Sequence, residues 1–563
     1  PYGMSNFEDV IMQNCYYVDK TMYIPLLEDQ ANYLIFIRPR RFGKSLLLSM
    51  VRSYYDLSQK DKFQQLFGNL WIGQHATPLQ GKYQILYLDF SKIGGNIDEL
   101  PQRFDSYSAV QLDGFLNRYR EYYTDEFIER FSAADKGIDK LHILDDEARR
   151  LGYPLYLIID EYDNFTNVVL NEKGNEIYRA ITHASGFYRD AFKNYKGMFD
   201  RIFMIGVSPV TLDDLSSGYN IGWNISTSPV FNQMLGFSEK DVRTMFQYYK
   251  ETGQLHGDIE EMILEMKPWY DNYCFSEDRL EERMFNSDMA LYFLNSYLQL
   301  GKAPKMMVDN NIRTDYNKLR HLVQIDKTFG ANASVIQQII AEGSITAQIA
   351  TSFPAEKMTD TENFKSLLFY FGMLSIQGVY RGTPVLGIPN LTVREQLYTY
   401  LTEAYSRASL FDVDISRLSS LVMGMAYDGE WESVFRFFAR ELERQSAIRE
   451  FIDGEAHIKG FLLAYLGLTQ GYVILPEHES SKGYADFYMM PDLLHQPDIA
   501  YSYIVEVKYA RRDASDADIA LLKRDAAEQL RRYAADEKVL RTKGNTRLEL
   551  ITLVFKGWEL VVL

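Results

Sequence analysis

Short apolar runs alternate with longer amphipathic stretches through the first 245 residues of the chain. The apolar runs occupy 33–37, 84–90, 155–159 and 201–207, and helical spacing of apolar residues is found at 105–131 and 175–192. The runs lack the strict alternation of a half-exposed strand, so they are typical of strands covered on both faces. Strands and helices that alternate in this way predict a parallel sheet with helices on both faces.

The pattern changes twice further along the chain. From 246 to 445 nearly every periodic stretch is helical, with examples at 258–266, 288–300, 333–341 and 431–443, and residues 380–383 separate two short strand-like pieces as a hairpin turn does. From 446 the expected order is helix, three strands, helix and strand, at 455–468, 472–475, 485–490, 501–507, 517–535 and 548–556. We therefore expect an α/β chain of three domains: 1–245, a mainly helical lid or linker region at 246–445, and a second α/β domain at 446–563.

The first apolar run leads directly into a basic loop. Residues 38–45 read Arg-Pro-Arg-Arg-Phe-Gly-Lys-Ser, and an apolar helix is predicted from Leu46. Strand, Gly-Lys-Ser and helix together indicate a phosphate-binding P-loop, because a helix N-terminus offers unpaired N–H groups and positive dipole charge to an anion. Gly43 permits a close approach, Lys44 reaches the β- and γ-phosphates, and Ser45 contacts Mg²⁺. The alternative is an ordinary basic turn, and Arg38 stands where the usual motif has glycine.

A second apolar run ends in two adjacent carboxylates, Asp160 and Glu161. At the carboxyl edge of a parallel sheet Asp160 lies beside the P-loop, where it can hold Mg²⁺ through water. Glu161 can then orient or deprotonate an attacking water. The alternative is a solvated acidic turn. Ser208, which follows the run at 202–207, is a candidate sensor of the γ-phosphate, unless it is a simple strand end before Pro209.

These segments resemble the bacterial AAA-ATPase-like family over roughly residues 2–290. The matching motifs are Tyr17-Val18-Asp19-Lys20-Thr21, the loop at 38–45, Ile159-Asp160-Glu161-Tyr162-Asp163, Gly206-Val207-Ser208-Pro209, Met234-Leu235-Gly236-Phe237-Ser238 and Trp269-Tyr270-Asp271-Asn272-Tyr273-Cys274-Phe275. In that family the Arg-Pro-Arg-Arg-Phe-Gly-Lys-Ser loop is the normal form. The resemblance implies a P-loop NTPase fold that binds ATP; it does not by itself establish hydrolysis or a substrate.

The predicted nucleotide-binding residues follow from this loop and from the strands beside it. They are Arg40, Arg41, Phe42, Gly43, Lys44, Ser45, Leu46, Asp160 and Ser208. Arg38, Arg40 and Arg41 can contact phosphates or act as an arginine finger on a neighbouring subunit of a homo-oligomer; a solvated basic loop is the equal alternative.

Carboxylates also mark the last domain. Glu506 and Lys508 lie two residues apart in an expected strand, so both point to one face of the sheet. Asp486, on a neighbouring strand, can face them. The two carboxylates and the Val507 carbonyl then make an oxygen-rich site suited to Mg²⁺ or Mn²⁺. A metal there polarises a phosphodiester, and Lys508 can position the nucleophile or stabilise developing charge.

This arrangement resembles the PD-(D/E)XK nuclease superfamily, which has a restriction-endonuclease-like α/β fold. The resemblance places Glu455 as a further acidic metal ligand on the preceding helix and Gln529 in the helix that follows the Glu-x-Lys strand. One departure is Tyr484, where relatives often have arginine. Glu477 and Glu479 are alternative ligands or else belong to a surface turn, and His457 and His478 can assist or be structural.

Composition and charge restrict the partners. The chain has 563 residues and a formal net charge of −17, so nucleic acid must meet a local basic patch. Such a patch is available among eleven basic residues between Lys508 and Arg547, although ordinary surface charge explains it equally well. Only Cys15 and Cys274 occur, far apart, which fits a reducing compartment. No apolar run reaches membrane-spanning length and no signal peptide is evident, so we expect no membrane contact and a cytoplasmic location.

These observations lead to one hypothesis and one alternative. The hypothesis is an ATP-binding, ATP-hydrolysing protein with a Mg²⁺-dependent nuclease domain that acts on DNA; its catalytic residues are Glu161, Asp486, Glu506, Lys508 and Gln529. The alternative is a non-catalytic, ATP-switched sensing or binding module whose nuclease fold is retained for recognition. Cleavage of DNA with Mg²⁺ or Mn²⁺ separates the two.

Overall fold

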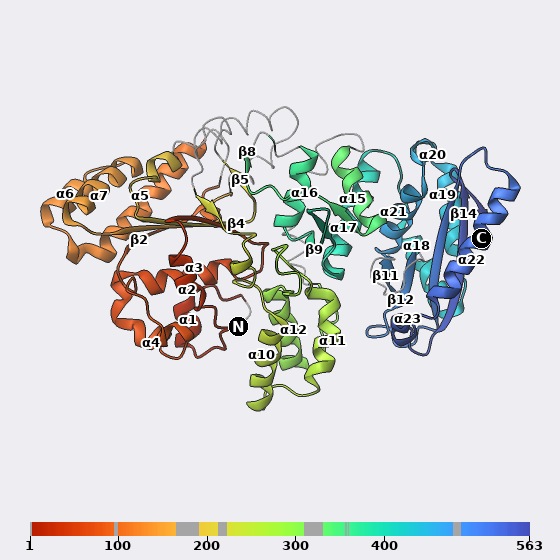
Figure 1. Cartoon of the computed structure of the whole chain (residues 1–563), viewed down its shortest axis with the longest axis horizontal. Helices are drawn as coiled ribbons and strands as arrows, with labels where there is room; N and C mark the ends of the chain where they lie inside the picture. The colour runs from red at the N-terminus through yellow and green to blue at the C-terminus, as the bar shows by residue number, and fades with distance from the viewer. Residues whose placement is uncertain are drawn as a thin grey trace. The chain divides into compact units, whose positions relative to one another are not determined.

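The structure is a computed structural model that describes residues 3–94, 99–164, 191–211, 222–308, 330–354, 357, 360–476 and 486–563 (Figure 1). The chain forms two compact units. The N-terminal unit comprises Pro1–Lys318 and Ala347–Pro384, and the C-terminal unit comprises Leu319–Thr346 and Val385–Leu563. Each unit contains a five-stranded sheet of its own.

The sheet of the N-terminal unit is entirely parallel and has the strand order β2-β3-β4-β1-β6. Its strands are β1 (Tyr33–Ile37), β2 (Gln84–Asp89), β3 (Leu155–Asp160), β4 (Arg201–Gly206) and β6 (Trp223–Asn224). β1 and β3 are buried almost throughout, as expected for strands covered on both faces. The register sets Asp89 opposite Asp160 and Ile37 opposite Gly206, so the carboxyl ends of four strands meet at one edge. The predicted parallel α/β architecture is confirmed.

Helices cover both faces of this sheet. α3 packs against β3, whereas α5 packs against β2 on the other face and carries α7 (Figure 1). The helices before residue 152 are α1 (Phe7–Met12), α2 (Tyr23–Glu28), α3 (Lys44–Tyr55), α4 (Phe63–Phe67), α5 (Leu100–Tyr119), α6 (Asp125–Ser132) and α7 (Gly137–Leu151). The single helical stretch expected at 105–131 is thus two helices, because the Thr124 side chain caps α6 by accepting from the Phe127 N–H. The helix expected at 175–192 falls mostly outside the described residues.

The rest of the N-terminal unit is mainly helical. It contains α10 (Glu239–Glu251), α11 (Ile259–Tyr270), α12 (Ser287–Leu300) and α16 (Thr361–Tyr370), with the short strands β5 (Val210–Thr211), β8 (Phe353–Pro354) and β9 (Ser375–Tyr380). As predicted, β9 turns into β10 (Thr383–Gly387) through two residues of positive φ, Arg381 and Gly382. The strands show that the region from 246 to 445 is less purely helical than its periodicity suggests.

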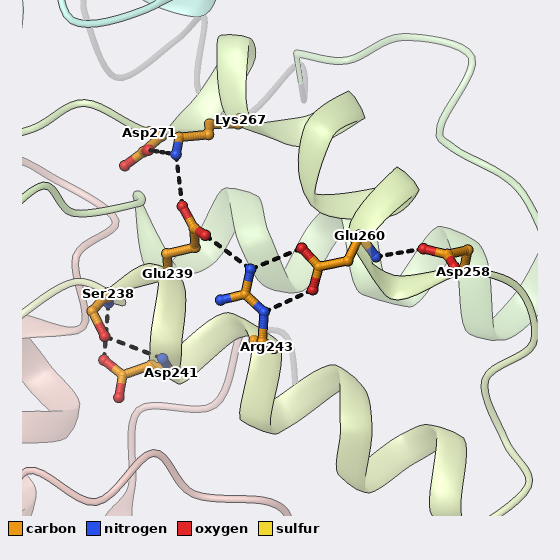
Figure 2. A network of polar contacts seen from close by, with 8 residues as sticks. All are labelled: Ser238, Glu239, Asp241, Arg243, Asp258, Glu260, Lys267 and Asp271. Carbon is orange, nitrogen blue, oxygen red and sulfur yellow. Dashed lines mark hydrogen bonds and ion pairs between the residues drawn. The ribbon is translucent and has the colours of Figure 1, made fainter.

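An ion-pair network joins α10 to α11 (Figure 2). The Glu239 carboxylate forms ion pairs with the Lys267 ammonium at 2.6 Å and with the Arg243 guanidinium at 2.9 Å. Arg243 also donates to both carboxylate oxygens of Glu260. The Ser238 side chain caps α10 in a reciprocal capping box with Asp241. Because the paired groups are largely exposed, the network aligns the two helices more than it stabilises them.

The C-terminal unit has a mixed sheet of order β11-β12-β13-β14-β15. Only the β13–β14 pair is parallel. The strands are β11 (Tyr472–Pro476), β12 (Phe487–Pro491), β13 (Tyr501–Ala510), β14 (Arg547–Lys556) and β15 (Glu559–Val562). β13 continues three residues beyond the expected 501–507, so Glu506 and Lys508 lie inside the strand rather than at its end. The predicted α/β class of this region is confirmed.

Helices surround the mixed sheet. α21 and α18 pack against β13, and α22 packs against β13 and β14. The described helices of this unit are α15 (Ala331–Glu342), α17 (Leu391–Arg407), α18 (Ile415–Asp428), α19 (Trp431–Arg444), α20 (Ser446–Phe451), α21 (Glu455–Leu466), α22 (Asp516–Tyr533) and α23 (Glu537–Thr542); the short strand β7 (Ser344–Thr346) pairs with β10. Across the described residues of both units, every helix is too short or too polar to cross a membrane.

Candidate functional site

The loop at residues 38–45 connects β1 to α3. Gly43 is the N-cap of α3 and has a φ of 88°, a conformation that glycine adopts without strain. The Lys44 ammonium is buried and donates to the backbone carbonyl oxygens of Arg38 and Pro39 at 3.2 and 3.0 Å. Burial lowers the pKa of Lys44, while nearby carboxylates oppose that shift. The loop therefore holds its own lysine beside the helix N-terminus where a phosphate group would bind.

Arg38 points away from this position. Its guanidinium is 1% exposed and donates to the carbonyl oxygens of Ile37, Ser226 and Phe231 at 2.7 to 2.9 Å. It also lies over the ring of Phe275, with 4.1 Å between Cζ and the ring centroid. Arg38 therefore anchors the loop to the segment after β6, and the interpretation of this arginine as a phosphate contact is replaced by a structural role.

The second half of the loop meets the acidic edge of the sheet. Ser45 Oγ donates to Asp160 Oδ2 at 2.7 Å, and the Tyr87 hydroxyl donates to the same oxygen at 3.4 Å. Burial raises the pKa of Asp160, and the Ser45 hydrogen bond opposes the rise. The next residue, Glu161, has a positive φ of 51°, which is strained for a side chain of this kind. Strain of this kind is commonly stored at functional sites.

Loop and acidic edge line a common cavity of about 450 Å³. Eight of the predicted residues line it: Arg40, Arg41, Gly43, Lys44, Ser45, Leu46, Asp160 and Glu161. Its lining also includes Asp89, Asn164 and Asp288, which the sequence interpretation missed. Asp89 had a usable signal, since it lies at the end of an apolar run just as Asp160 does.

Two predicted residues lie outside the lining of this cavity. Ser208 is buried, and its Oγ accepts a hydrogen bond from the Val210 N–H at 3.1 Å. Phe42 is also buried and packs edge-on against Tyr273 and Phe275. The sensor role of Ser208 stays a prediction that requires this hydroxyl to turn.

An apolar pocket of about 100 Å³ adjoins the cavity and shares Gly43, Leu46 and Asp288 with it. Its walls include Tyr16, Val18, Phe42, Met234 and Met245. A polar chamber and an apolar one thus meet at the N-terminus of α3.

Residues at the N-terminus of α12 form hydrogen bonds with the same loop. Ser287 Oγ and the Asp288 N–H both donate to the Arg41 carbonyl oxygen, at 3.1 and 3.2 Å. The Arg41 guanidinium lies 3.4 Å from the Asp288 carboxylate, and Arg41 itself has a φ of 67°. These contacts tie the helical part of the N-terminal unit to the P-loop.

The C-terminal unit brings its predicted residues together at β13. The Glu506 carboxylate is fully buried; its Oε1 lies 2.6 Å from Lys508 Nζ, and its Oε2 accepts from the Asp486 N–H at 3.0 Å. In return, Asp486 Oδ2 accepts from the Val507 N–H at 2.6 Å. Asp486 directly precedes β12, which pairs antiparallel with β13, so the two carboxylates share one face of the sheet.

Burial and mutual repulsion perturb these groups. Burial, followed by the charge of Asp486, raises the pKa of Glu506 to about 8. The pKa of Glu455, in the first turn of α21, is raised by burial and by Asp486 as well. The pKa of Lys508 lies above its ordinary value, because its contact with Glu506 outweighs the effect of burial. Repulsion between two carboxylates this close is relieved by a neighbouring cation or by protonation of one of them.

Lysine 459 is a functional candidate that sequence reasoning missed. It lies on α21, one turn after Glu455, and its Nζ is 2.9 Å from Asp486 Oδ1. Its signal in the sequence is a single charged residue within an apolar helix. Each of the two strand carboxylates therefore contacts one lysine ammonium, Asp486 with Lys459 and Glu506 with Lys508.

The donor chemistry fits a small divalent cation. Asp486 and Glu506 supply oxygen ligands only, and one or two carboxylates with water are what Mg²⁺ usually takes from a protein. Within the described residues, no group of three or more acidic, histidine or cysteine side chains is arranged to hold a metal ion. Glu455 instead accepts a hydrogen bond from the Tyr509 backbone. The alternative ligands Glu477 and Glu479 lie outside the described residues, as do His478 and Tyr484.

The remaining predicted residues of this unit lie on α21, on α22 and in the segment between β13 and α22. Gln529 is on α22, and its Oε1 is buried without a hydrogen-bond donor among the described residues. His457 is half-buried, 2.6 Å from an Asp453 oxygen and edge-on to the Phe451 ring. A group of exposed basic side chains lies before and on α22, among acidic neighbours. Its members are Arg511, Arg512, Lys523, Arg524, Arg531 and Arg532.

Comparisons with known proteins match the two ends of the chain separately. Residues 1–216 match the family described as "Predicted AAA-ATPase", and residues 453–563 match the PD-(D/E)XK nuclease superfamily. A protein of Azotobacter chroococcum mcd 1, recorded as uncharacterized in the vnfD 5' region, is 24% identical over 304 residues. The match covers 52% of this chain and 51% of that protein, so it spans about half the length of the relative.

Two solved structures also align with the chain. The Aeropyrum pernix ORC2 protein, solved as ADPNP–ADP complexes, aligns with a TM-score of 0.30 at 11% identity, covering 69% of this chain and 93% of its own. The Aeropyrum pernix ORC1 protein in complex with DNA aligns with a TM-score of 0.24 at 11% identity, covering 71% and 94%.

Proposed function

We infer that this protein is an ATP-dependent nuclease that acts on DNA. The chain contains an AAA-ATPase-like domain at residues 1–216 and a PD-(D/E)XK nuclease superfamily domain at 453–563. The observation that carries the proposal is that Glu506 contacts both Asp486 and Lys508 on one face of the sheet. Structural ion pairs rarely bury two carboxylates side by side, because each raises the cost of ionising the other.

The nucleotide part of the proposal rests on the two adjoining chambers. The polar cavity presents Lys44, Ser45 and the N–H groups of α3 to phosphates. The apolar pocket offers Tyr16 and Met234 to a nucleobase. Ser45 and Asp160 supply neighbouring oxygens to the Mg²⁺ of an incoming ATP, and Glu161 orients the attacking water.

The nuclease part uses the residues around β13. Asp486 and Glu506 would hold Mg²⁺ or Mn²⁺, which when bound supplies polarisation of the phosphodiester and a water of lowered pKa. Lys508 opposes the rise in the pKa of Glu506 and presents an ammonium to the reacting phosphate. Gln529 supplies a buried amide that can orient a water or a phosphate oxygen. The exposed basic residues on and before α22 give an otherwise acidic protein a surface for the DNA backbone.

ATP would act on cleavage through the helical region at 246–445. We propose it as the domain that follows 1–245 in the sequence and precedes 446–563, with parts that belong to each of the two compact units. The support is local: α12 donates two hydrogen bonds to the loop that meets the phosphates. A movement of the loop on ATP binding would therefore be transmitted to α12 through these two hydrogen bonds.

The test is cleavage of plasmid and single-stranded DNA with Mg²⁺ or Mn²⁺, with and without ATP. Wild type is expected to cut and Lys508→Ala to be at least about 100-fold slower, because a charge that stabilises the transition state is lost. Arg407→Ala, which removes an exposed basic residue of the same unit outside the surface proposed for DNA, is the matched control and is expected to cut normally. Equal rates for wild type and Lys508→Ala defeat the nuclease assignment.

A second function is favoured by one observation. Both strand carboxylates already contact a lysine, which would also satisfy them in a site that binds no metal. In that case the protein is an ATP-switched binding or sensing module with a non-catalytic nuclease fold. Binding of Mn²⁺ that is lost in Asp486→Asn, together with cleavage, rules this alternative out.

A further inference from the structure

One charged side chain lies within an otherwise apolar buried stretch of the C-terminal unit. Residues 458–466 of α21 are all buried, and Lys459 is the single charged residue among them. A buried ammonium is costly unless a carboxylate meets its charge. Lys459 Nζ lies 2.9 Å from Asp486 Oδ1, and Asp486 is itself 4% exposed. The Glu-x-Lys motif does not include this lysine, and packing alone would favour an apolar residue here.

The position of Lys459 matters because of how the Asp486 oxygens are shared. Oδ2 accepts the Val507 N–H, and Oδ1 faces Lys459. On Glu506, Oε2 accepts the Asp486 N–H, and Oε1 faces Lys508. The Asp486 side of the centre thus carries a fixed positive charge that comes from the helix, and the Glu506 side carries one that comes from the strand.

Charge counting limits what else the centre can hold. When a bound cation ionises them, Glu455, Asp486 and Glu506 bring three negative charges, and Lys459 and Lys508 bring two positive ones. One divalent ion and one bound phosphodiester then leave the centre neutral. A second divalent ion would add two uncompensated positive charges next to a buried ammonium.

We propose that Lys459 takes the place of a second metal ion, so that the centre binds a single divalent cation. Lys459 is then a positioning residue that fixes the Asp486 carboxylate for this ion. The inference rests on the proposed nuclease function and adds the number of ions that the site uses.

Manganese titration of the full chain without nucleotide tests the proposal. Calorimetry gives the number of Mn²⁺ ions bound, and electron paramagnetic resonance distinguishes an isolated ion from a spin-coupled pair. The Asp486→Asn/Glu506→Gln double variant serves as the blank and counts ions bound elsewhere, including at the P-loop. Wild type is expected to bind one ion above this blank, with an isolated-ion spectrum.

Substitution of Lys459 supplies the decisive comparison. Lys459→Met keeps the length of the side chain and removes its charge, so a second ion is expected to bind at least tenfold more tightly than to wild type, with a coupled-pair spectrum. Lys459→Arg keeps the charge and is expected to bind one ion. Lys523→Met, on exposed α22, is the matched control and is also expected to bind one.

The outcomes separate this inference from the function on which it rests. Two ions in wild type, or an unchanged count in a folded Lys459→Met, overturn the inference and leave a metal-dependent nuclease standing. If wild type binds none above the blank, the nuclease proposal itself fails. If Lys459→Met does not fold, the wild-type count decides alone, because one ion supports the inference and two refute it.

Discussion

Replacing Lys44 with alanine tests whether the cavity at the N-terminus of α3 is a nucleotide site. In the structure Lys44 Nζ donates to two backbone carbonyl oxygens of its own loop, those of Arg38 and Pro39. When ATP binds, the Lys44 ammonium must exchange its hydrogen bonds to these neutral carbonyl oxygens for contacts with the charged phosphates. The affinity that Lys44 contributes is therefore the difference between the two sets of contacts.

The magnitude follows from this exchange. A charge pair about 4 Å apart in a partly solvated site is worth about 4 kcal/mol. Leaving the two carbonyls takes back about 1–2 kcal/mol, since each such hydrogen bond has a modest net value. The remaining 2–3 kcal/mol, roughly, corresponds to an ATP affinity that is about 30- to 150-fold weaker in Lys44→Ala.

The assay is equilibrium binding of a fluorescent ATP analogue with Mg²⁺ at physiological ionic strength. Lys82→Ala removes an exposed lysine from the same unit and is the matched control, expected to bind as wild type does. If Lys44→Ala binds within threefold of wild type, Lys44 does not meet the phosphates and the cavity is not the site.

Three further substitutions address the framework of the N-terminal unit. Arg38→Met takes a donor from three buried carbonyls, of which only that of Phe231 is shown to keep another donor, the Met234 N–H. It also removes a buried charge, so urea unfolding should show a net loss of about 2–4 kcal/mol; no loss contradicts the anchoring role. Gly206→Ala places a Cβ 2.4 Å from an Asp163 oxygen and should slow ATP turnover more than it weakens binding, unlike Gly94→Ala, whose Cβ meets nothing within 4 Å. Arg243→Ala breaks exposed pairs only and should lower the melting temperature by no more than about 2 °C at pH 7. Pairing lowers the pKa of its partner carboxylates, so this small effect should be present above about pH 4.5 and fade below it.

Sequence patterns predicted most of the fold because the buried strands consist almost entirely of apolar residues. The run Tyr33–Ile37 matches β1 residue for residue, and β3 extends the expected 155–159 by one residue, Asp160. Both strands are buried on both faces, so each appears in the sequence as a short continuous apolar run. Helix ends were less predictable, since a single capping residue, Thr124, divided a stretch of continuous helical periodicity.

For the two sites, the sequence predicted the residues that belong to recognisable motifs and missed those that approach the motifs only through tertiary packing. The motif gives Lys44 and Ser45 but not the direction of Arg38, which depends on carbonyls 188 and 193 residues further along the chain. Lys459 was missed because its partner Asp486 lies on another element, and a helix of apolar residues gives no hint of a nearby carboxylate. Contacts of this kind are fixed by tertiary packing, which periodicity does not record.

The proposed function requires that ATP bound beside Lys44 change the rate of DNA cleavage at the Asp486–Glu506 centre. The most direct measurement is the single-turnover rate of Mg²⁺-dependent cleavage of end-labelled duplex DNA, with and without ATP, in wild type, Lys44→Ala and Glu506→Gln. We expect ATP to change the rate in wild type but not in Lys44→Ala, and we expect Glu506→Gln not to cut in either condition. Cleavage that survives in Glu506→Gln, or an ATP effect that survives in Lys44→Ala, would contradict it.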